Sequence, residues 1–79
     1  MSGRRTFKPV KITIKGKTKT VYTVMQAGKT LLNEWPEQTR QAKAAERLVL
    51  DVVNEVATPE EVRRAFLAAA TASDIKYSS

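Results

Sequence analysis

Apolar and polar residues alternate near the start of the chain, as they do in a half-buried β-strand. In the stretch VKITI, residues 10–14, the valine and both isoleucines fall on one side, and the lysine and the threonine fall on the other. The dipeptide Gly16-Lys17 follows soon after, and a leading glycine suits a two-residue type II′ turn. Threonine, valine and tyrosine dominate residues 18–22, so we predict a return strand there and hence a β-hairpin.

The register of this hairpin depends on the length of its turn. A two-residue turn at this dipeptide would place Val10 opposite Thr23 and would give the hairpin one apolar face and one basic face. A longer loop would bury Tyr22 in place of Val21, and the sequence leaves both registers open. Because an isolated hairpin is barely stable, we expect it to pack on helices, with or without a third short strand.

Three segments follow in which apolar residues recur at helical spacing, over residues 24–33, 39–56 and 59–72. Thr23 begins a capping box that a glutamine three residues later completes. Thr58 gives the strongest local signal for the start of a helix. It is followed by a proline at the first helical position and by two acids in the first turn. The short connection between the last two segments predicts that their helices pack as an antiparallel hairpin.

Trp35 directly precedes Pro36 between the first two predicted helices, in the stretch LLNEWPEQTRQA. Proline supplies no N–H and disfavours helical geometry in the residue before it, so the first helix must end at or before Trp35. We predict that the indole closes one end of the small core as a structural anchor, although tryptophan is also enriched at binding hot spots. Phe66, in the apolar stripe of the third helix, is the second predicted anchor.

The predicted elements give an α+β domain in which a β-hairpin is covered by three helices, in the order ββααα. The chain of 79 residues is too short for a second core, so we expect a flexible basic arm over residues 1–6 and one domain over residues 7–79. No apolar run follows Met1, and uncharged stretches such as AFLAAATAS are far shorter than the ~20 residues of a bilayer span. We therefore expect a soluble, cytoplasmic protein that does not enter a membrane.

The composition argues against catalysis and metal binding. The chain has no cysteine and no histidine, so a disulfide framework is excluded and a zinc site would have to consist of carboxylates alone. The sequence pairs none of the carboxylates with an apolar pocket that would suit a general base. Both Gly-Lys-Thr tripeptides lack the glycine that a phosphate-binding loop places five residues earlier. We expect no enzymatic activity, no cofactor and no metal.

The net charge of +6 is concentrated at the start of the chain: residues 1–33 carry eight basic and no acidic side chains, and residues 34–79 carry six basic and eight acidic ones. Basic ribbons and arms bind in the grooves of nucleic acids, on whose bases Phe7 or Tyr22 would stack. Lysines on a hairpin also have a role that needs no partner, because their charge opposes aggregation through the edge strands. The candidate surface for an anionic partner comprises Arg4, Arg5, Lys8, Lys11, Lys15, Lys17 and Lys19.

Three residues at helical positions are candidates for a protein contact. Glu60 precedes Arg64 by four residues, which is the favourable order for an ion pair on a helix. This pair gives Arg64 a structural role but gives none to Arg63. Leu67 lies about 100° around the third helix from its apolar stripe, and Leu32 lies beside the stripe of the first helix. Leu32, Arg63 and Leu67 form the candidate protein-contact surface, although both leucines also fit the periphery of the core.

Two functional hypotheses follow from the lack of catalytic groups and the uneven distribution of charge. The leading hypothesis is a non-enzymatic binding or regulatory module that acts through contact with a protein partner or with a second copy of itself, as a homodimer. The alternative hypothesis is a nucleic-acid-binding protein that uses the basic arm and the hairpin.

Three stretches of the sequence, FKPVKI, QAGKTLLNEWP and VRRAFLAAATASDI, resemble the small bacterial proteins of domain-of-unknown-function family 982. The resemblance covers nearly the whole chain, and the Trp-Pro and Arg-x-Ala-Phe elements are its most specific parts. This chain lacks the cysteine that members often carry in the middle helix. The resemblance implies a compact ββααα domain that stands alone as a whole protein, and it implies no activity because the family is uncharacterised.

Overall fold

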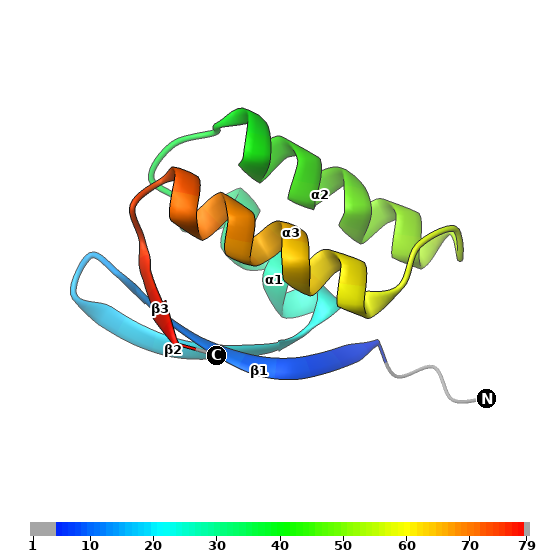
Figure 1. Ribbon diagram of the computed structural model, residues 1–79, viewed down its shortest axis with the longest axis horizontal. Helices are drawn as coiled ribbons and strands as arrows, with labels where there is room; N and C mark the ends of the chain where they lie inside the picture. Colours follow the sequence, from blue (N-terminus) through cyan, green and yellow to red (C-terminus); the bar gives the residue numbers. More distant parts are fainter. Residues whose placement is uncertain (1–4, 79) are drawn as a thin grey trace.

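The computed structural model describes residues 5–78, which form one antiparallel sheet with three helices packed on one of its faces (Figure 1). The strand order is β2-β1-β3, so the first strand lies in the middle and the last strand lies at one edge. This is the α+β, ββααα arrangement that the sequence predicts, with the third short strand present. The elements are β1 (Thr6–Ile14), β2 (Lys17–Thr23), α1 (Val24–Asn33), α2 (Arg40–Val53), α3 (Pro59–Ala72) and β3 (Lys76–Ser78).

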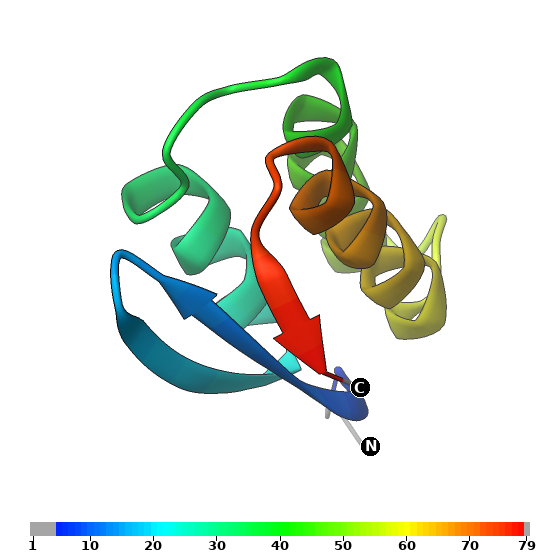
Figure 2. The same cartoon turned by 60° about the vertical axis from the view of Figure 1, so that its left-hand side comes forward.

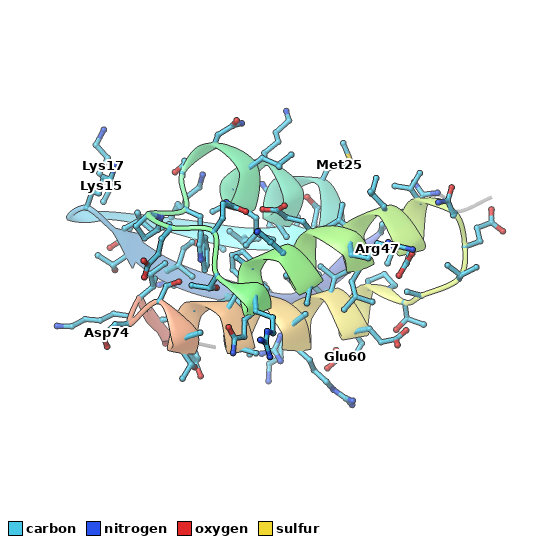
Figure 3. All side chains as sticks on the ribbon, turned by 90° about the horizontal axis from the view of Figure 1, so that it is seen from above. Lys15, Lys17, Met25, Arg47, Glu60 and Asp74 are labelled. Atoms are coloured by element: carbon cyan, nitrogen blue, oxygen red, sulfur yellow. The ribbon has the colours of Figure 1, made fainter. Side chains whose placement is uncertain are left out.

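The hairpin turns at Lys15 and Gly16, one residue earlier than predicted (Figure 3). Both residues have positive φ angles, 53° and 78°, as a type I′ turn requires. Val10 therefore pairs with Val21, and the predicted pairing of Val10 with Thr23 is wrong by two residues. A shift by an even number of residues keeps each side chain on its predicted face of the sheet.

The helices cover one face of the sheet and leave the other face open to solvent (Figures 1 and 2). Val21 is fully buried, whereas Tyr22 is 46% exposed, so the longer loop that would bury the tyrosine is excluded. The apolar residues of β1 and β2 lie under the helices and form the sheet side of the core. They are Val10, Ile12, Ile14 and Val21.

The chain returns to the sheet after α3. Asp74 adopts a left-handed backbone conformation with a φ of 58°, and the N–H of Ile75 bonds to the carbonyl of Ala70 at 2.8 Å. This closes the end of the helix in the manner of a left-handed C-cap. The side chain of Ile75 is buried, and β3 then pairs antiparallel with residues 11–13 of β1.

Two of the three helices have the predicted bounds, α1 and α3, and both begin with a capping box. The hydroxyl of Thr23 accepts from the N–H of Gln26 at 3.0 Å, and the hydroxyl of Thr58 accepts from the N–H of Glu61 at 3.3 Å. In each box the side chain three residues on accepts from the threonine N–H in return. Within residues 5–78 there is no helix with the length and hydrophobicity of a membrane span.

α2 is shorter than the predicted helix at both ends. Thr39 is its N-cap, because the hydroxyl accepts from the N–H of Ala42 at 3.1 Å. At the other end Glu55 has a left-handed φ of 64°, and the N–H of Val56 bonds to the carbonyl of Asp51 at 2.8 Å. The chain therefore leaves the helix before Val56, which is exposed rather than part of the apolar stripe.

Trp35 lies in the core just after the end of α1. Only 8% of the residue is exposed, and its indole packs against Phe66, with the ring centres 5.3 Å apart and tilted by 57°. The indole Nε1 donates a hydrogen bond to the hydroxyl of Ser73 at 3.1 Å. Pro36 is exposed and opens the connection to α2. The tryptophan thus ties the ends of α1 and α3 together.

β1 begins at Thr6, inside the segment expected to be a flexible arm. Thr6 pairs with Thr23 of β2, and the carbonyl of Arg5 accepts from the N–H of Val24 at 2.9 Å. The end of the predicted arm is therefore joined to the sheet and to α1. Residues 1–4 of that arm, Arg4 among them, lie outside the described part of the chain.

Candidate protein-binding groove between α1 and α2

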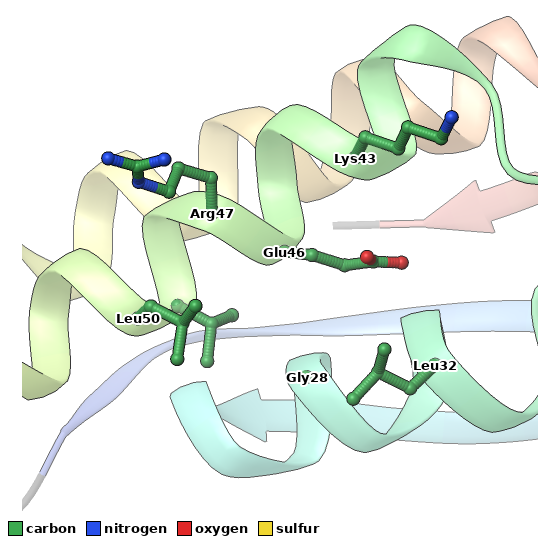
Figure 4. Close-up of a pocket in the computed structure, with 7 residues that line it drawn as sticks. Gly28, Leu32, Lys43, Glu46, Arg47 and Leu50 are labelled. Carbon is green, nitrogen blue, oxygen red and sulfur yellow. The ribbon is translucent and has the colours of Figure 1, made fainter.

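A groove with a mainly apolar lining runs between α1 and α2 (Figure 4). Leu32 lies on its α1 side and Leu50 on its α2 side, and these side chains are 69% and 59% exposed. Further residues of α1 and α2 complete the lining. The full set is Gly28, Leu32, Lys43, Glu46, Arg47, Val49 and Leu50.

Gly28 forms the floor of the groove and sets the distance between the two helices. A Cβ atom at this position would lie 3.2 Å from Cγ1 of Val49, which is tighter than an ordinary van der Waals contact. The absence of a side chain therefore allows α1 and α2 to approach closely at this point. Leu32, one turn after Gly28 on α1, and Leu50, the residue after Val49 on α2, project above this floor.

The apolar surface continues beyond the groove along both helices. Met25 precedes Leu32 by seven residues on α1, and Val53 follows Leu50 by three residues on α2, so each lies on the same helix face as its neighbour. Both Met25 and Val53 are exposed. In the described chain, most of the exposed large apolar side chains are on α1 and α2 or, for Val56, just after α2. Such clustering, unlike scattered exposure, is typical of a contact surface.

Polar groups of both signs border the leucines. Lys43, Glu46 and Arg47 project from α2, and Glu46 points toward α1 (Figure 4). The Oε2 atom of Glu46 is buried and accepts no hydrogen bond from the described residues.

The three residues predicted to form a protein-contact surface are not brought together. Leu32 lines the groove, but Arg63 and Leu67 do not. Arg63 donates from Nε to the carbonyl of Lys8 at 3.1 Å and so joins α3 to β1. Leu67 is partly buried against the core. Leu50 was not predicted from the sequence to be a contact residue. A signal for it was present, because Leu50 and Val53 lie on one face of α2 outside the core stripe, as Met25 and Leu32 do on α1.

The basic residues of the hairpin do not share one face either. Lys11 points to the open side of the sheet, whereas Lys17 and Lys19 pair with Ile14 and Ile12 and so lie on the helix side. The Nζ atom of Lys19 is 2.6 Å from Oε2 of Glu34, in an ion pair with the end of α1. Figure 3 shows Lys15 and Lys17 projecting from the tip of the hairpin. Arg5 lies just before β1, and Lys8 lies near its start.

Several carboxylates outside the groove have structural partners. Asp51 lies 3.5 Å from Arg47, and Glu60 lies 3.8 Å from Arg64, each pair four residues apart on a helix. Glu61 belongs to the capping box of α3. Within residues 5–78 no three acidic side chains are grouped closely enough to hold a metal ion.

Comparison with known proteins gives a family match. The model of a family described as a protein of unknown function, DUF982, matches residues 8–77, from within β1 to within β3. No curated protein and no solved structure matches the chain. Because the family match covers nearly the whole chain, this protein belongs to the DUF982 family of proteins of unknown function.

Proposed function

We propose that this protein is a small, non-enzymatic binding or regulatory module that acts through protein–protein contact at the α1–α2 groove. The observation that carries the proposal is the pair Leu32 and Leu50, which lie on the two sides of the groove with most of their surface exposed. A chain of this size has few apolar residues to spare for its surface, because its core is small. Their clustering on two neighbouring helices supports a contact role.

The groove suits either an α-helix of a partner protein or the helical layer of a second copy. An amphipathic helix binds such a groove with apolar side chains at positions i, i+3 or i+4, and i+7. Each square ångström of apolar surface removed from water contributes about 25 cal/mol, against which the cost of association is set. Lys43, Glu46 and Arg47 present both signs of charge beside the leucines, which favours one orientation of a partner.

We also propose that the protein acts in the cytoplasm of a bacterial cell. A chain without cysteine fits a reducing compartment, and the family resemblance is to small bacterial proteins. Fractionation of cells that express a tagged chain checks this proposal. Recovery of the chain in the membrane or periplasmic fraction would contradict it.

Replacement of both groove leucines by glutamine tests the contact role. Glutamine keeps the helix propensity of leucine and adds no charge, so Leu32→Gln with Leu50→Gln should change the free energy of unfolding by no more than ~1 kcal/mol. We expect the wild-type chain to form a dimer in sedimentation equilibrium, or to capture a defined protein from an extract of its own cells. The double variant should lose that contact.

Val56→Gln is the matched control, because Val56 is an exposed apolar residue that does not line the groove. This variant should retain the contact. A wild-type chain that sediments as a monomer and captures no partner would contradict the proposal. The proposal would also fail if the double variant and the control behaved alike.

A further inference from the structure

Among residues 5–78, the open face of the sheet carries mainly lysine, threonine and tyrosine side chains and no apolar cluster. The pairing of the strands decides which residues lie there, because directly opposite residues of neighbouring strands share a face. Lys11 of β1 is opposite Thr20 of β2 and opposite Ser78 of β3. The residues that point away from the helices, here named the open sheet face, are Lys11, Thr13, Thr18, Thr20, Tyr22, Lys76 and Ser78.

The charges of the molecule are segregated between its two layers. None of the acidic residues lies in a strand: all of them belong to α2, to α3 or to the segments that directly follow α1, α2 and α3. The three strands carry only lysine among charged side chains. Glu34, at the end of α1, pairs with Lys19 on the helix side of the sheet and not with Lys11 on the open side. The open sheet face is therefore a cationic surface without an acid of its own.

Lys11 lies at the centre of this surface. On β3, Lys76 lies two residues from the direct partner of Lys11, and on β2, Tyr22 lies two residues from the direct partner there. Both are therefore diagonal neighbours of Lys11 across the sheet. Diagonal neighbours on one face are about 7–8 Å apart between Cα atoms. The tyrosine ring is 46% exposed, and the two lysines are exposed. The three side chains thus follow one diagonal line across the face, with Lys11 between Tyr22 and Lys76.

We propose that the open sheet face binds single-stranded nucleic acid, with Lys11 and Lys76 on phosphates and Tyr22 stacked on a base. Lysine neutralises phosphate without regard to sequence, and an aromatic ring stacks on an unpaired base, whose ring face is accessible. The hydroxyl of Thr20, which is directly opposite Lys11, adds a donor for phosphate or sugar oxygens. This surface lies on the side of the sheet opposite the helices, so the proposal does not depend on the α1–α2 groove.

Fluorescence anisotropy with labelled oligonucleotides tests the proposal. Single- and double-stranded DNA and RNA of mixed sequence are titrated with the purified chain at several salt concentrations. We expect the single strands to bind, with an affinity whose logarithm falls linearly with the logarithm of salt concentration. Each phosphate engaged contributes about 0.7 to this slope, so Lys11→Gln with Lys76→Gln should reduce the slope by ~1.4. Lys29→Gln with Arg40→Gln makes the same change of net charge on exposed helix positions and should leave the slope unchanged.

The tyrosine provides a second, independent readout. Tyr22→Ala should weaken binding by ~5- to 150-fold, and Tyr22→Phe, which keeps the ring, should bind as the wild-type chain does. All the residues replaced are exposed, and an unchanged urea midpoint verifies that each variant is folded. Tyr22→Phe also excludes the possibility that the lost affinity comes from the hydroxyl alone.

Four results would overturn the proposal. The first is the absence of binding to any oligonucleotide at low salt. The second is an equal loss of affinity in the helix variants and the sheet variants, which would mean attraction to net charge alone. The third is a preference for double strands that does not depend on Tyr22. The fourth is tighter binding, through Lys11 and Lys76, to an acidic peptide or to vesicles of anionic lipid than to single strands.

Discussion

At the scale of single residues, the hairpin turn holds two neighbouring residues in left-handed backbone geometry. Gly16 adopts a φ of 78° without strain, but Lys15 adopts a φ of 53° with a side chain attached. Left-handed geometry costs a residue with a Cβ atom about 1–2 kcal/mol, and asparagine is one of the few that tolerate it. Nothing lies within 4 Å of a Cβ built on Gly16, so backbone conformation alone opposes a substitution there.

Substitutions in this turn should therefore change stability in opposite directions. Lys15→Asn creates the Asn-Gly pair that type I′ turns favour and should raise the free energy of unfolding by up to ~1 kcal/mol. Gly16→Ala should lower it by about 1–2 kcal/mol. Urea denaturation followed by circular dichroism measures both changes. An unchanged midpoint for Gly16→Ala would contradict this description of the turn.

The hydrogen bond between Trp35 and Ser73 is a second feature at this scale. Ser73→Ala removes the acceptor of an indole N–H in a residue that is only 8% exposed, which should lower the free energy of unfolding by about 1 kcal/mol. The same serine replacement made together with Trp35→Phe should cost almost nothing, because phenylalanine has no N–H to satisfy. The double-mutant cycle isolates the pair. Equal costs in both backgrounds would mean that Ser73 acts through something other than the indole.

At the scale of elements, the helices could be predicted closely because their ends are encoded locally. Thr23, Thr39 and Thr58 each accept a bond from a free N–H of the first turn. The hairpin register could not be predicted, since Gly16 suits either position of a two-residue turn. Registers that differ by two residues bury the same side chains, so the apolar pattern does not distinguish them. β3 consists of only three exposed residues and has no pattern of its own.

The capping box of α3 gives a prediction at this scale. Thr58→Ala removes the hydroxyl that accepts from the N–H of Glu61 and should lower the free energy of unfolding by about 1 kcal/mol. Thr58→Ser keeps an oxygen in place and should be nearly neutral. Thermal and urea denaturation of the three chains measure the difference. If alanine and serine gave the same stability, the cap would not be a stabilising feature.

At the scale of the whole molecule, both proposed surfaces combine residues that the sequence keeps apart. The helical spacing identified Leu32 as a contact candidate beside the apolar stripe of α1. Only the packing of α1 on α2 brings it to the same groove as Leu50. Lys76 joins Lys11 because β3 pairs with β1. Pairings of this kind depend on long-range packing, which local spacing does not report. The uneven distribution of charge along the chain could be predicted from the sequence. Its separation into a cationic sheet and a helical layer of mixed charge became clear only from the fold.

Site-specific crosslinking in cells tests the contact at the α1–α2 groove most directly. A photo-reactive phenylalanine derivative is introduced in place of Leu50 in one chain and in place of Val56 in another, and the covalent adducts are identified by mass spectrometry. We expect a defined protein adduct, to a partner or to a second copy, from position 50 and not from position 56, and we expect Leu32→Gln to abolish it. Adducts of the same kind from both positions, or none from position 50, would contradict the role of the groove.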